Sequence, residues 1–177
     1  MAEKQNRQRQ ARILRDFRKI HRWTGALLFV FFFIISVTGL LLGWKKHSNG
    51  ILLAKTHKGT STNLANWLPL DSLHKRACYH LHKEVSPGLS LKLNRIDVRK
   101  DKGTVKFVFD EHYWGIQLDG ATGGLLHVEQ RRADFLEQIH DGSILDHYLG
   151  PSNGQIKLVY TTIMGLALLI FTVTGFW

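Results

Sequence analysis

The sequence predicts a membrane protein in which two transmembrane α-helices flank a small α+β domain, with one helix on an antiparallel meander of three to four strands. Two uncharged runs, residues 23–44 and 158–177, are each long enough to cross a bilayer, because a helix rises about 1.5 Å per residue. Between these runs, apolar residues at helical spacing give way to alternation with a period of two. These observations define the fold class.

The first run, residues 23–44, reads WTGALLFVFFFIISVTGLLLGW and contains no charged residue. It is apolar on every side, unlike the helices that cover the surface of a soluble protein. It is too long for the apolar part of a secretory signal, and no small-residue cleavage site follows it. We therefore expect it to span the membrane, as we expect of residues 158–177.

The basic residues predict the orientation in the membrane. Residues 1–22 carry eight Lys and Arg against Glu3 and Asp16, and such an excess beside a membrane helix marks the cytoplasmic side. We therefore expect a cytoplasmic N-terminus, with residues 45–157 on the outer side. The same cluster accounts for most of the net charge of +10 and favours contact with membrane lipids. Because no base-stacking motif accompanies it, it does not indicate binding of nucleic acid.

The outer segment, residues 45–157, divides into three parts. Residues 45–66 are polar and contain the glycines and hydroxyl residues expected of a linker. Residues 67–131 predict the folded domain, and residues 132–157 predict a helical or irregular approach to the second membrane helix. Since Cys78 is the only cysteine, no disulfide can form within the chain, and the domain has to rest on its own apolar core.

Within the domain, the spacing of apolar residues first predicts a helix that ends before Pro87. Its apolar face is formed by Leu70, Leu73, Ala77 and Leu81. Alternating residues then predict strands around positions 91–98, 105–109, 114–118 and 126–128, joined by turns that contain Asp and Gly. The alternation slips at Asn94-Arg95, which predicts a β-bulge.

Short motifs mark the ends of the membrane helices and the last turn of the domain. HRWTG opens the first membrane helix and VTGLLLGW closes it, whereas IHDGS precedes the second helix and TVTGFW closes that one. The last strands meet at LDGATGGLL, which is similar to the D-x-x-T-G turn of a PepSY domain. Together, over roughly residues 17–177, the chain resembles a short, two-helix member of the PepSY-associated transmembrane family.

The resemblance implies a function in iron reduction. Larger members of that family have four membrane helices, and some are inner-membrane reductases of ferric siderophores in which membrane histidines hold haem. By this resemblance, the chain is an accessory or haem-bearing subunit of transmembrane electron transfer in the bacterial inner membrane, with a periplasmic outer domain. Haem b is then its cofactor, and a siderophore or a periplasmic redox protein is its partner. Other members are proposed to bind or restrain peptidases. The alternative is therefore a non-enzymatic binding module that holds a peptidase, a peptide or a partner membrane protein.

Histidines near the ends of the membrane helices are the candidate haem ligands: His21, His47, His140 and His147. His21 adjoins a basic and an aromatic residue, so it is either an interfacial anchor or an axial ligand. Since the second membrane helix contains no histidine, a second copy or another membrane subunit would have to supply the other ligand at that depth. On the outer side, His47 paired with His140 or His147 is the alternative to an exposed polar loop.

The sequence shows no self-contained catalytic site. His74, Cys78 and His82 share one flank of the predicted helix, but a lone cysteine beside an apolar stripe is usually a small hydrophobic residue, and we predict no metal site there. The glycines of DGATGG lie between two strands rather than before a helix, so they do not form a nucleotide-binding loop. Any reduction would need electrons from elsewhere.

Small residues recur in both membrane helices. Gly39 and Gly43 form a G-x-x-x-G motif, and Gly165 and Gly175 lie in the second helix. Such residues let helices approach each other closely in lipid, so they predict packing within the chain or dimerisation. The endings IISVTGLLLGW and LIFTVTGFW also resemble each other, which is compatible with a pseudo-symmetric pair.

Overall fold

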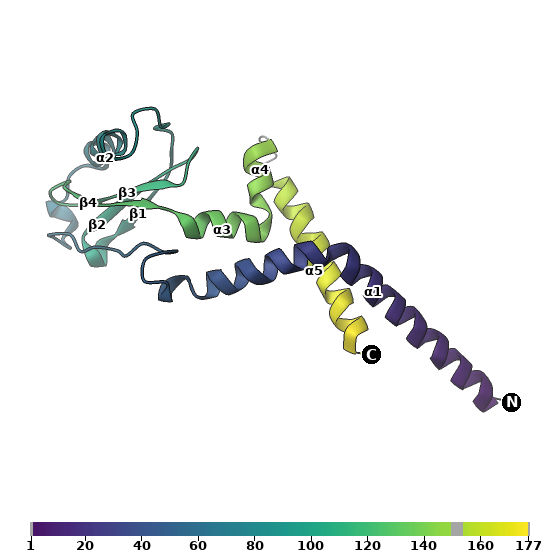
Figure 1. The fold of residues 1–177 in the computed structure, drawn as a ribbon. Helices are drawn as coiled ribbons and strands as arrows, with labels where there is room; N and C mark the ends of the chain where they lie inside the picture. Colours follow the sequence, from purple (N-terminus) through teal and green to yellow (C-terminus); the bar gives the residue numbers. More distant parts are fainter. Residues whose placement is uncertain (1, 150–153, 177) are drawn as a thin grey trace. The chain divides into compact units, whose positions relative to one another are not determined.

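The computed structural model describes residues 2–149 and 154–176 and divides into two compact units. One unit contains the membrane helices and is formed by Met1–Leu42 with Leu136–Trp177; the other, Gly43–Phe135, contains the sheet. Two helices long and apolar enough to cross a membrane thus flank a four-stranded antiparallel sheet (Figure 1). The predicted fold class is confirmed.

The membrane helices are α1, Ala2–Gly43, and α5, Gln155–Phe176. Helix α1 includes the basic segment as well as the apolar run, so the helix continues beyond the part that lipid would cover. Two short helices precede α5: α3, Arg132–Asp141, and α4, Ser143–Leu149. Most apolar side chains of α1 and α5 are exposed, as expected of surfaces that contact lipid tails rather than protein.

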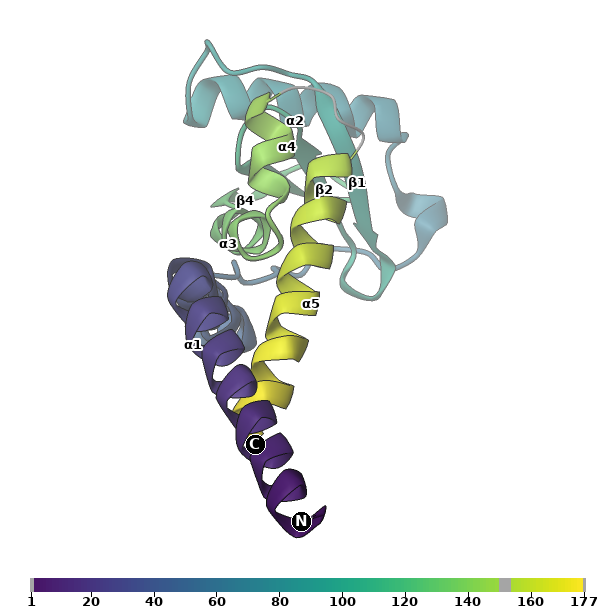
Figure 2. The ribbon, with the colours of Figure 1, turned by 90° about the vertical axis from the view of Figure 1, so that its right-hand side faces the viewer.

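Helices α1 and α5 cross each other and run in opposite directions (Figures 1 and 2). Just past the middle of α1, Gly25 faces the ring of Phe171, and further along Phe31 meets Tyr160 edge to face, with ring centroids 6.4 Å apart. Among the described residues of this unit, the buried side chains are Thr38, Met164 and Ala167. The helix pair therefore has a thin interface in which a threonine is buried with apolar residues.

The outer domain is a helix on a four-stranded meander. Helix α2, Leu70–Glu84, lies on one face of the sheet, whose strands follow in the order β1-β2-β3-β4. The strands are β1, Leu93–Arg99; β2, Thr104–Phe109; β3, Trp114–Asp119; and β4, Leu125–Gln130. The fully buried core is formed by Leu73, Ala77, Leu81, Val105, Phe107, Phe109, Ile116 and Leu118. Burial of these side chains is the main contribution to the stability of the domain.

The predicted bulge is confirmed, since the register of β1 against β2 shifts between Leu93 and Arg95. A second shift, between Gln117 and Leu118 of β3, was not predicted. It lies next to the turn into β4, and the period-two alternation on the core side continues through it. The sequence pattern therefore contained no signal for it.

The turn between β3 and β4 explains the LDGATGGLL motif. Asp119 is 3% exposed, and its carboxylate accepts hydrogen bonds from the amides of Ala121 and Thr60, at 2.9 and 3.1 Å. A side chain at Gly120 would collide with the Trp67 ring, because a Cβ there would lie 2.4 Å from it. Gly123 has a φ of +68°, a backbone conformation that glycine adopts without strain.

The segment predicted as a linker is held against the turn between β1 and β2. The amide of Gly59 donates to the carbonyl of Lys102 at 2.8 Å, and a Cβ on Gly59 would lie 2.1 Å from the Gly103 carbonyl oxygen. Further along, the indole of Trp67 donates to the carbonyl of Ser61 at 2.9 Å. The linker is thus an ordered strap on the domain, fastened through backbone groups whose partners a sequence pattern does not reveal.

The carboxylate of Asp119 makes the stability of the domain depend on pH. Burial raises the pKa of Asp119, but hydrogen bonds from Thr60, Ala121 and Thr122 outweigh it and lower the pKa below its ordinary value of 3.8. The unfolded chain therefore binds a proton more readily than the folded chain does. The stabilisation is present above the ordinary value and is lost as the pH falls through the lowered pKa.

We expect Asp119→Ala to lower the free energy of unfolding by about 1–3 kcal/mol, because buried amides lose their acceptor. Asp119→Asn keeps one acceptor oxygen and is expected to lose less. Unfolding of the full chain in detergent measures both variants. Asp101→Ala, at an exposed acidic residue in a nearby turn, is the control. An equal loss in this control would contradict the role given to Asp119.

Candidate functional site

The repeated helix endings are the places where two histidines pack. The tripeptide Val-Thr-Gly occurs at residues 37–39 in α1 and again at 173–175 in α5. His140 of α3 faces the first copy, and His21 of α1 faces the second. The two sites repeat the same three groups, an imidazole against a threonine hydroxyl and a glycine.

His21 turns towards α5. Its Nδ1 lies 3.1 Å from the carbonyl oxygen of Phe171 and 3.2 Å from the hydroxyl of Thr174. Its ring stacks on the ring of Phe171, with centroids 4.0 Å apart. Gly175 provides the room, because a Cβ there would lie 3.0 Å from His21 Cε1. The neighbouring Trp23 is 66% exposed, so the aromatic anchor and the histidine point in different directions.

His140 makes the matching contact with α1. Its Nδ1 lies 2.9 Å from the hydroxyl of Thr38, a residue that is 6% exposed. Gly39 is again the residue that leaves space, since a Cβ there would lie 3.3 Å from His140 Cε1. Gly43 and Gly165, by contrast, have no neighbour within 4 Å of such a Cβ. The predicted G-x-x-x-G motif is therefore divided, and only Gly39 takes part in packing within the chain.

The hydrogen bonds indicate which nitrogen of His21 and of His140 carries the proton when the ring is neutral. The hydroxyl of Thr38 donates to the Ile34 carbonyl at 2.7 Å, and that of Thr174 donates to the Ile170 carbonyl at 2.7 Å. A hydroxyl carries one hydrogen, so each threonine oxygen accepts from the histidine. The Phe171 carbonyl can only accept, which gives the same assignment for the first site. Nδ1 is therefore the donor in both contacts, and a neutral ring held in this way has its lone pair on Nε2.

The residues after His140 fasten the chain to the start of α5. The carboxylate of Asp141 lies 2.5 Å from the ammonium of Lys157 and accepts from the Ser143 amide at 2.9 Å. Burial raises the pKa of Asp141, but the hydrogen bonds from Lys157 and Ser143 outweigh it and hold the pKa below its ordinary value. Gly142 has a φ of +76° and lies against the Tyr160 ring. The IHDGS motif thus positions His140.

The four predicted histidines differ in their surroundings. Thr38, which contacts His140, lies 17 residues after His21 in one helix, a rise of about 26 Å, so these two histidines cannot bind the same atom. His47 lies in a short 3-10 turn, Lys45–His47, with its ring exposed. His147 belongs to α4, and its side chain lies outside the described residues. The roles of all four as ligands stay predictions.

The cluster on α2 does not converge on a common point. Cys78 Sγ lies 3.4 Å from His74 Nε2, but the ring of His82 contacts the carbonyl of Leu89, at 2.9 Å. Burial raises the pKa of the Cys78 thiol, which favours the neutral thiol over a thiolate ligand. Within the described ranges, no group of three or more His, Cys, Asp or Glu side chains is placed to hold a metal ion.

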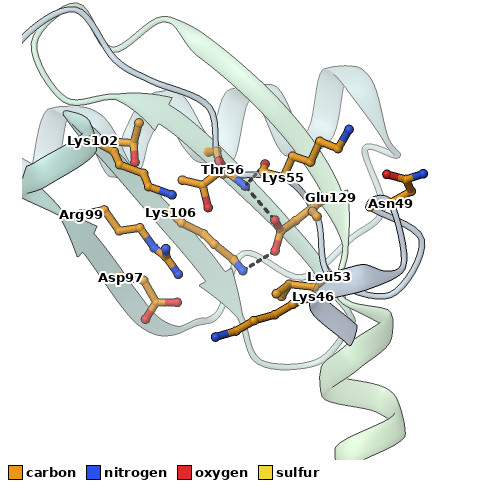
Figure 3. Close-up of a pocket in the computed structure, with 14 residues that line it drawn as sticks. Lys46, Asn49, Leu53, Lys55, Thr56, Asp97, Arg99, Lys102, Lys106 and Glu129 are labelled. Atoms are coloured by element: carbon orange, nitrogen blue, oxygen red, sulfur yellow. Dashed lines mark hydrogen bonds and ion pairs between the residues drawn. The ribbon is translucent and has the colours of Figure 1, made fainter. Parts of the chain in front are cut away.

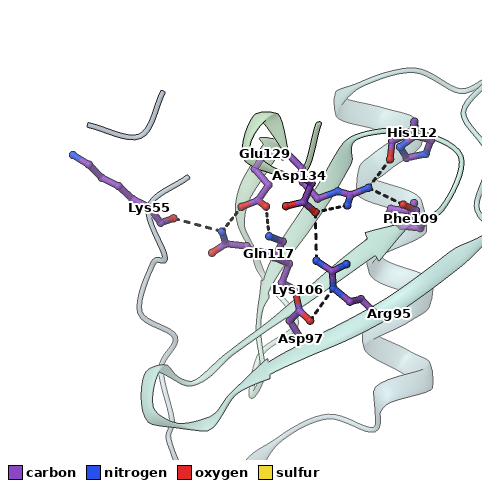
Figure 4. Close-up of polar contacts among 10 residues, drawn as sticks. Lys55, Arg95, Asp97, Lys106, Phe109, His112, Gln117, Glu129 and Asp134 are labelled. Atoms are coloured by element: carbon purple, nitrogen blue, oxygen red, sulfur yellow. Dashed lines mark hydrogen bonds and ion pairs between the residues drawn. The ribbon is translucent and has the colours of Figure 1, made fainter. Parts of the chain in front are cut away.

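Sequence reasoning missed a cavity of about 440 Å³ in the outer domain, on the sheet face away from α2 (Figure 3). Lys106 of β2, Gln117 of β3 and Glu129 of β4 project from this face. Glu129 is ion-paired with Lys106 and accepts from the amide of Gln117 at 2.8 Å (Figure 4). A signal existed, because these polar residues occupy positions in otherwise apolar strands.

The protein-family model described as the PepSY-associated TM region matches residues 18–177 of this chain, which is more than half of it. Comparisons with curated proteins and with solved structures give no match.

We expect that in Thr38→Val the proton of the neutral His140 ring is no longer held on Nδ1 and occupies either ring nitrogen. Valine has the shape of threonine but cannot accept a hydrogen bond. In the parent protein, ¹⁵N NMR of labelled histidine is expected to show His140 protonated at Nδ1. In the variant, the signal shifts towards a mixture of the two neutral forms. Thr162→Val removes a hydroxyl that is bonded only to its own helix, and it serves as the control.

The glycines give a second test of the same contacts. Gly39→Val and Gly175→Val are expected to lower the free energy of unfolding by about 1–3 kcal/mol, because the added side chain displaces a histidine ring. Gly165→Val, in the open part of α5, is the matched control. Unfolding in detergent, followed by circular dichroism, compares the variants. Equal effects at all three positions would show that the histidine contacts contribute nothing.

Proposed function

Because the chain belongs to the PepSY-associated transmembrane family, we propose that it is a haem-bearing subunit of transmembrane electron transfer directed towards the reduction of iron chelates. The observation that carries the proposal is the orientation of His21 and His140. In both rings, Nδ1 contacts protein acceptors, which leaves Nε2 as the nitrogen with a lone pair when the ring is neutral. This is the arrangement typical of a histidine that ligates a metal through Nε2.

The residues fit haem ligation on chemical grounds. A ligating imidazole has to be neutral and held in one orientation, and its second nitrogen usually donates to an oxygen. Thr174 and the Phe171 carbonyl fulfil this for His21, and Thr38 fulfils it for His140. Haem, when bound, supplies one-electron chemistry at the iron. The chain itself orients the imidazoles, and the apolar surface of α1 and α5 excludes water.

The proposal requires a further ligand for each histidine. His21 and Thr38, the residue that His140 contacts, are about 26 Å apart along α1, so each histidine needs a different partner. A second copy of this chain, or another membrane subunit, would bring a histidine to the same depth. At the outer face, His47 and His147 remain the proposed alternatives from this chain. Haem in this protein thus depends on its assembly, and oligomers are expected to hold more haem than monomers.

The distribution of basic residues supports an orientation of the chain in the membrane, and with it a direction for the proposed electron transfer. The excess of Lys and Arg in residues 1–22 supports a cytoplasmic N-terminus in the inner membrane and a periplasmic domain. Electrons would enter from a donor on the cytoplasmic side or within the membrane and leave towards a ferric siderophore or a periplasmic redox protein. His21 would then serve the inner leaflet and His140 the outer one.

We expect the purified full chain in detergent to show a b-type Soret band and an α band after reduction with dithionite. His21→Ala and His140→Ala should each remove or shift these bands, because each loses an Nε2 ligand. His47→Ala and His147→Ala test the alternative outer ligands, and at most one of them should match His140→Ala. His57→Ala, at an exposed ring of the outer domain, is the control.

A folded but colourless protein would refute haem ligation by this chain. It would leave the non-enzymatic module, which holds a peptidase, a peptide or a partner membrane protein, as the better account. Bands that survive every single histidine replacement would refute the ligand assignment alone. Bands that disappear in His57→Ala would mean that the loss reports misfolding, and the assignment would fail on that ground.

A further inference from the structure

The cavity on the polar face of the outer sheet has more basic than acidic residues in its lining (Figure 3). The ordered strap covers one side of it, and the ends of β1 and β2 form the other side. Its basic residues are Lys46, Lys55, Arg99, Lys102 and Lys106, and its acidic residues are Asp97 and Glu129. The volume, about 440 Å³, lies within the range of small-molecule sites, about 300–1,000 Å³. The lining therefore favours an anion of small-molecule size.

Most of this positive charge is not neutralised by the protein. Glu129 forms an ion pair with Lys106. The Oδ1 atom of Asp97 lies 3.3 Å from Nε of Arg95, a residue outside the cavity. Among the residues that the structure describes, no carboxylate forms an ion pair with the other four cations of the lining: Lys46, Lys55, Arg99 and Lys102. Lys46 of the strap and Arg99 and Lys102 of the hairpin of β1 and β2 turn towards one region of the cavity, whereas the Lys55 ammonium points away from it (Figure 3). An anion bound in that region would therefore connect the strap and the hairpin.

The floor of the cavity contains an acceptor without a donor. Gln117 is 3% exposed, and its Nε2 donates to Glu129 at 2.8 Å and to the Lys55 carbonyl at 3.5 Å (Figure 4). Because a carboxylate only accepts, the amide nitrogen has to face Glu129. The amide oxygen, Oε1, is left buried, with no hydrogen-bond partner in the described part of the chain. A buried acceptor in this state costs free energy unless a ligand donates to it.

The two observations define the ligand. Three cations without an ion pair, Lys46, Arg99 and Lys102, suit a phosphate group, which lysine binds as a point charge. Gln117 also lines the cavity, and its unsatisfied oxygen favours a ligand that carries an O–H or N–H group as well. We propose that the cavity binds a phosphate ester that carries hydroxyl groups, of the glycerol phosphate type. The cations hold the phosphate, and Gln117 Oε1 accepts a hydrogen bond from a ligand hydroxyl.

This chemistry has two sources, a free phosphate ester and the headgroup of a lipid such as phosphatidylglycerol. Lys46 lines the cavity and follows α1, which ends at Gly43, after only a few residues. A lipid headgroup is therefore one of the two sources, and the experiment has to distinguish it from a free phosphate ester. The site is independent of haem, because its lining residues belong to the outer domain alone, and a colourless protein would leave it intact.

The test is calorimetric titration of the full chain, in neutral detergent, with glycerol phosphate. We expect saturable binding, and at least tenfold weaker binding of propyl phosphate, which has the same carbon skeleton without hydroxyl groups. The double variant Arg99→Gln/Lys102→Gln should bind glycerol phosphate at least tenfold more weakly. Lys58→Gln/Lys100→Gln removes the same charge at two exposed lysines outside the cavity, and its affinity should stay within twofold of the parent.

Nanodiscs separate the two sources. If the headgroup occupies the site, discs of phosphatidylglycerol will block the titration that discs of phosphatidylcholine allow; if only the free ester binds, both discs give the same curve. Either result supports the site. It is overturned if glycerol phosphate fails to bind in detergent and in phosphatidylcholine discs. The site is also overturned if both double variants lose affinity equally, because binding would then follow the net charge of the protein. Binding of propyl phosphate as tight as that of glycerol phosphate would overturn it as well.

Discussion

A bilayer provides no water to polar groups, and this constraint organises the membrane unit. Each histidine that faces a membrane helix has to find its hydrogen-bond acceptor in the protein. Thr38 and Thr174 supply it, and each passes its own hydrogen to a carbonyl one turn earlier in its helix. The contacts between the elements are thin elsewhere, so the polar pairs determine where His21 and His140 lie. The same bonds occupy Nδ1 in both rings and leave Nε2 as the nitrogen without a protein contact of this kind among the described residues, which is the basis of the proposed ligand role.

The outer domain solves the opposite problem, because its polar groups have water as an alternative. Its sheet uses one face for an apolar core under α2 and the other for charges under the strap. The strap is fastened by backbone contacts at Gly59 and by the carboxylate of Asp119. The two units therefore offer different chemistry. The membrane unit presents imidazoles among apolar side chains, and the outer domain presents cations that no carboxylate of its described residues pairs with.

Much of the fold was predictable because burial leaves a period in the sequence. Uniform apolarity revealed both membrane helices, and the spacing of Leu73, Ala77 and Leu81 revealed α2. The candidate site was only partly predictable. The repeated Val-Thr-Gly endings were visible, but nothing in a linear sequence says that a histidine over a hundred positions away faces Thr38. The cavity escaped because its residues alternate with core residues, and Gln117 becomes informative only when its unpaired oxygen is seen.

Glycine at position 115 has a consequence for the sheet as a whole. A Cβ there would lie 3.3 Å from the Glu129 side chain and 3.4 Å from that of Lys106, so its absence leaves room for a charged pair on a surface that apolar residues could fill. Buried ion pairs seldom stabilise a fold as well as apolar side chains of the same volume do. Natural proteins tolerate such losses where function needs them. A domain repacked with apolar residues in place of Lys106 and Glu129 would therefore be the more stable fold, but it would lose the charged surface.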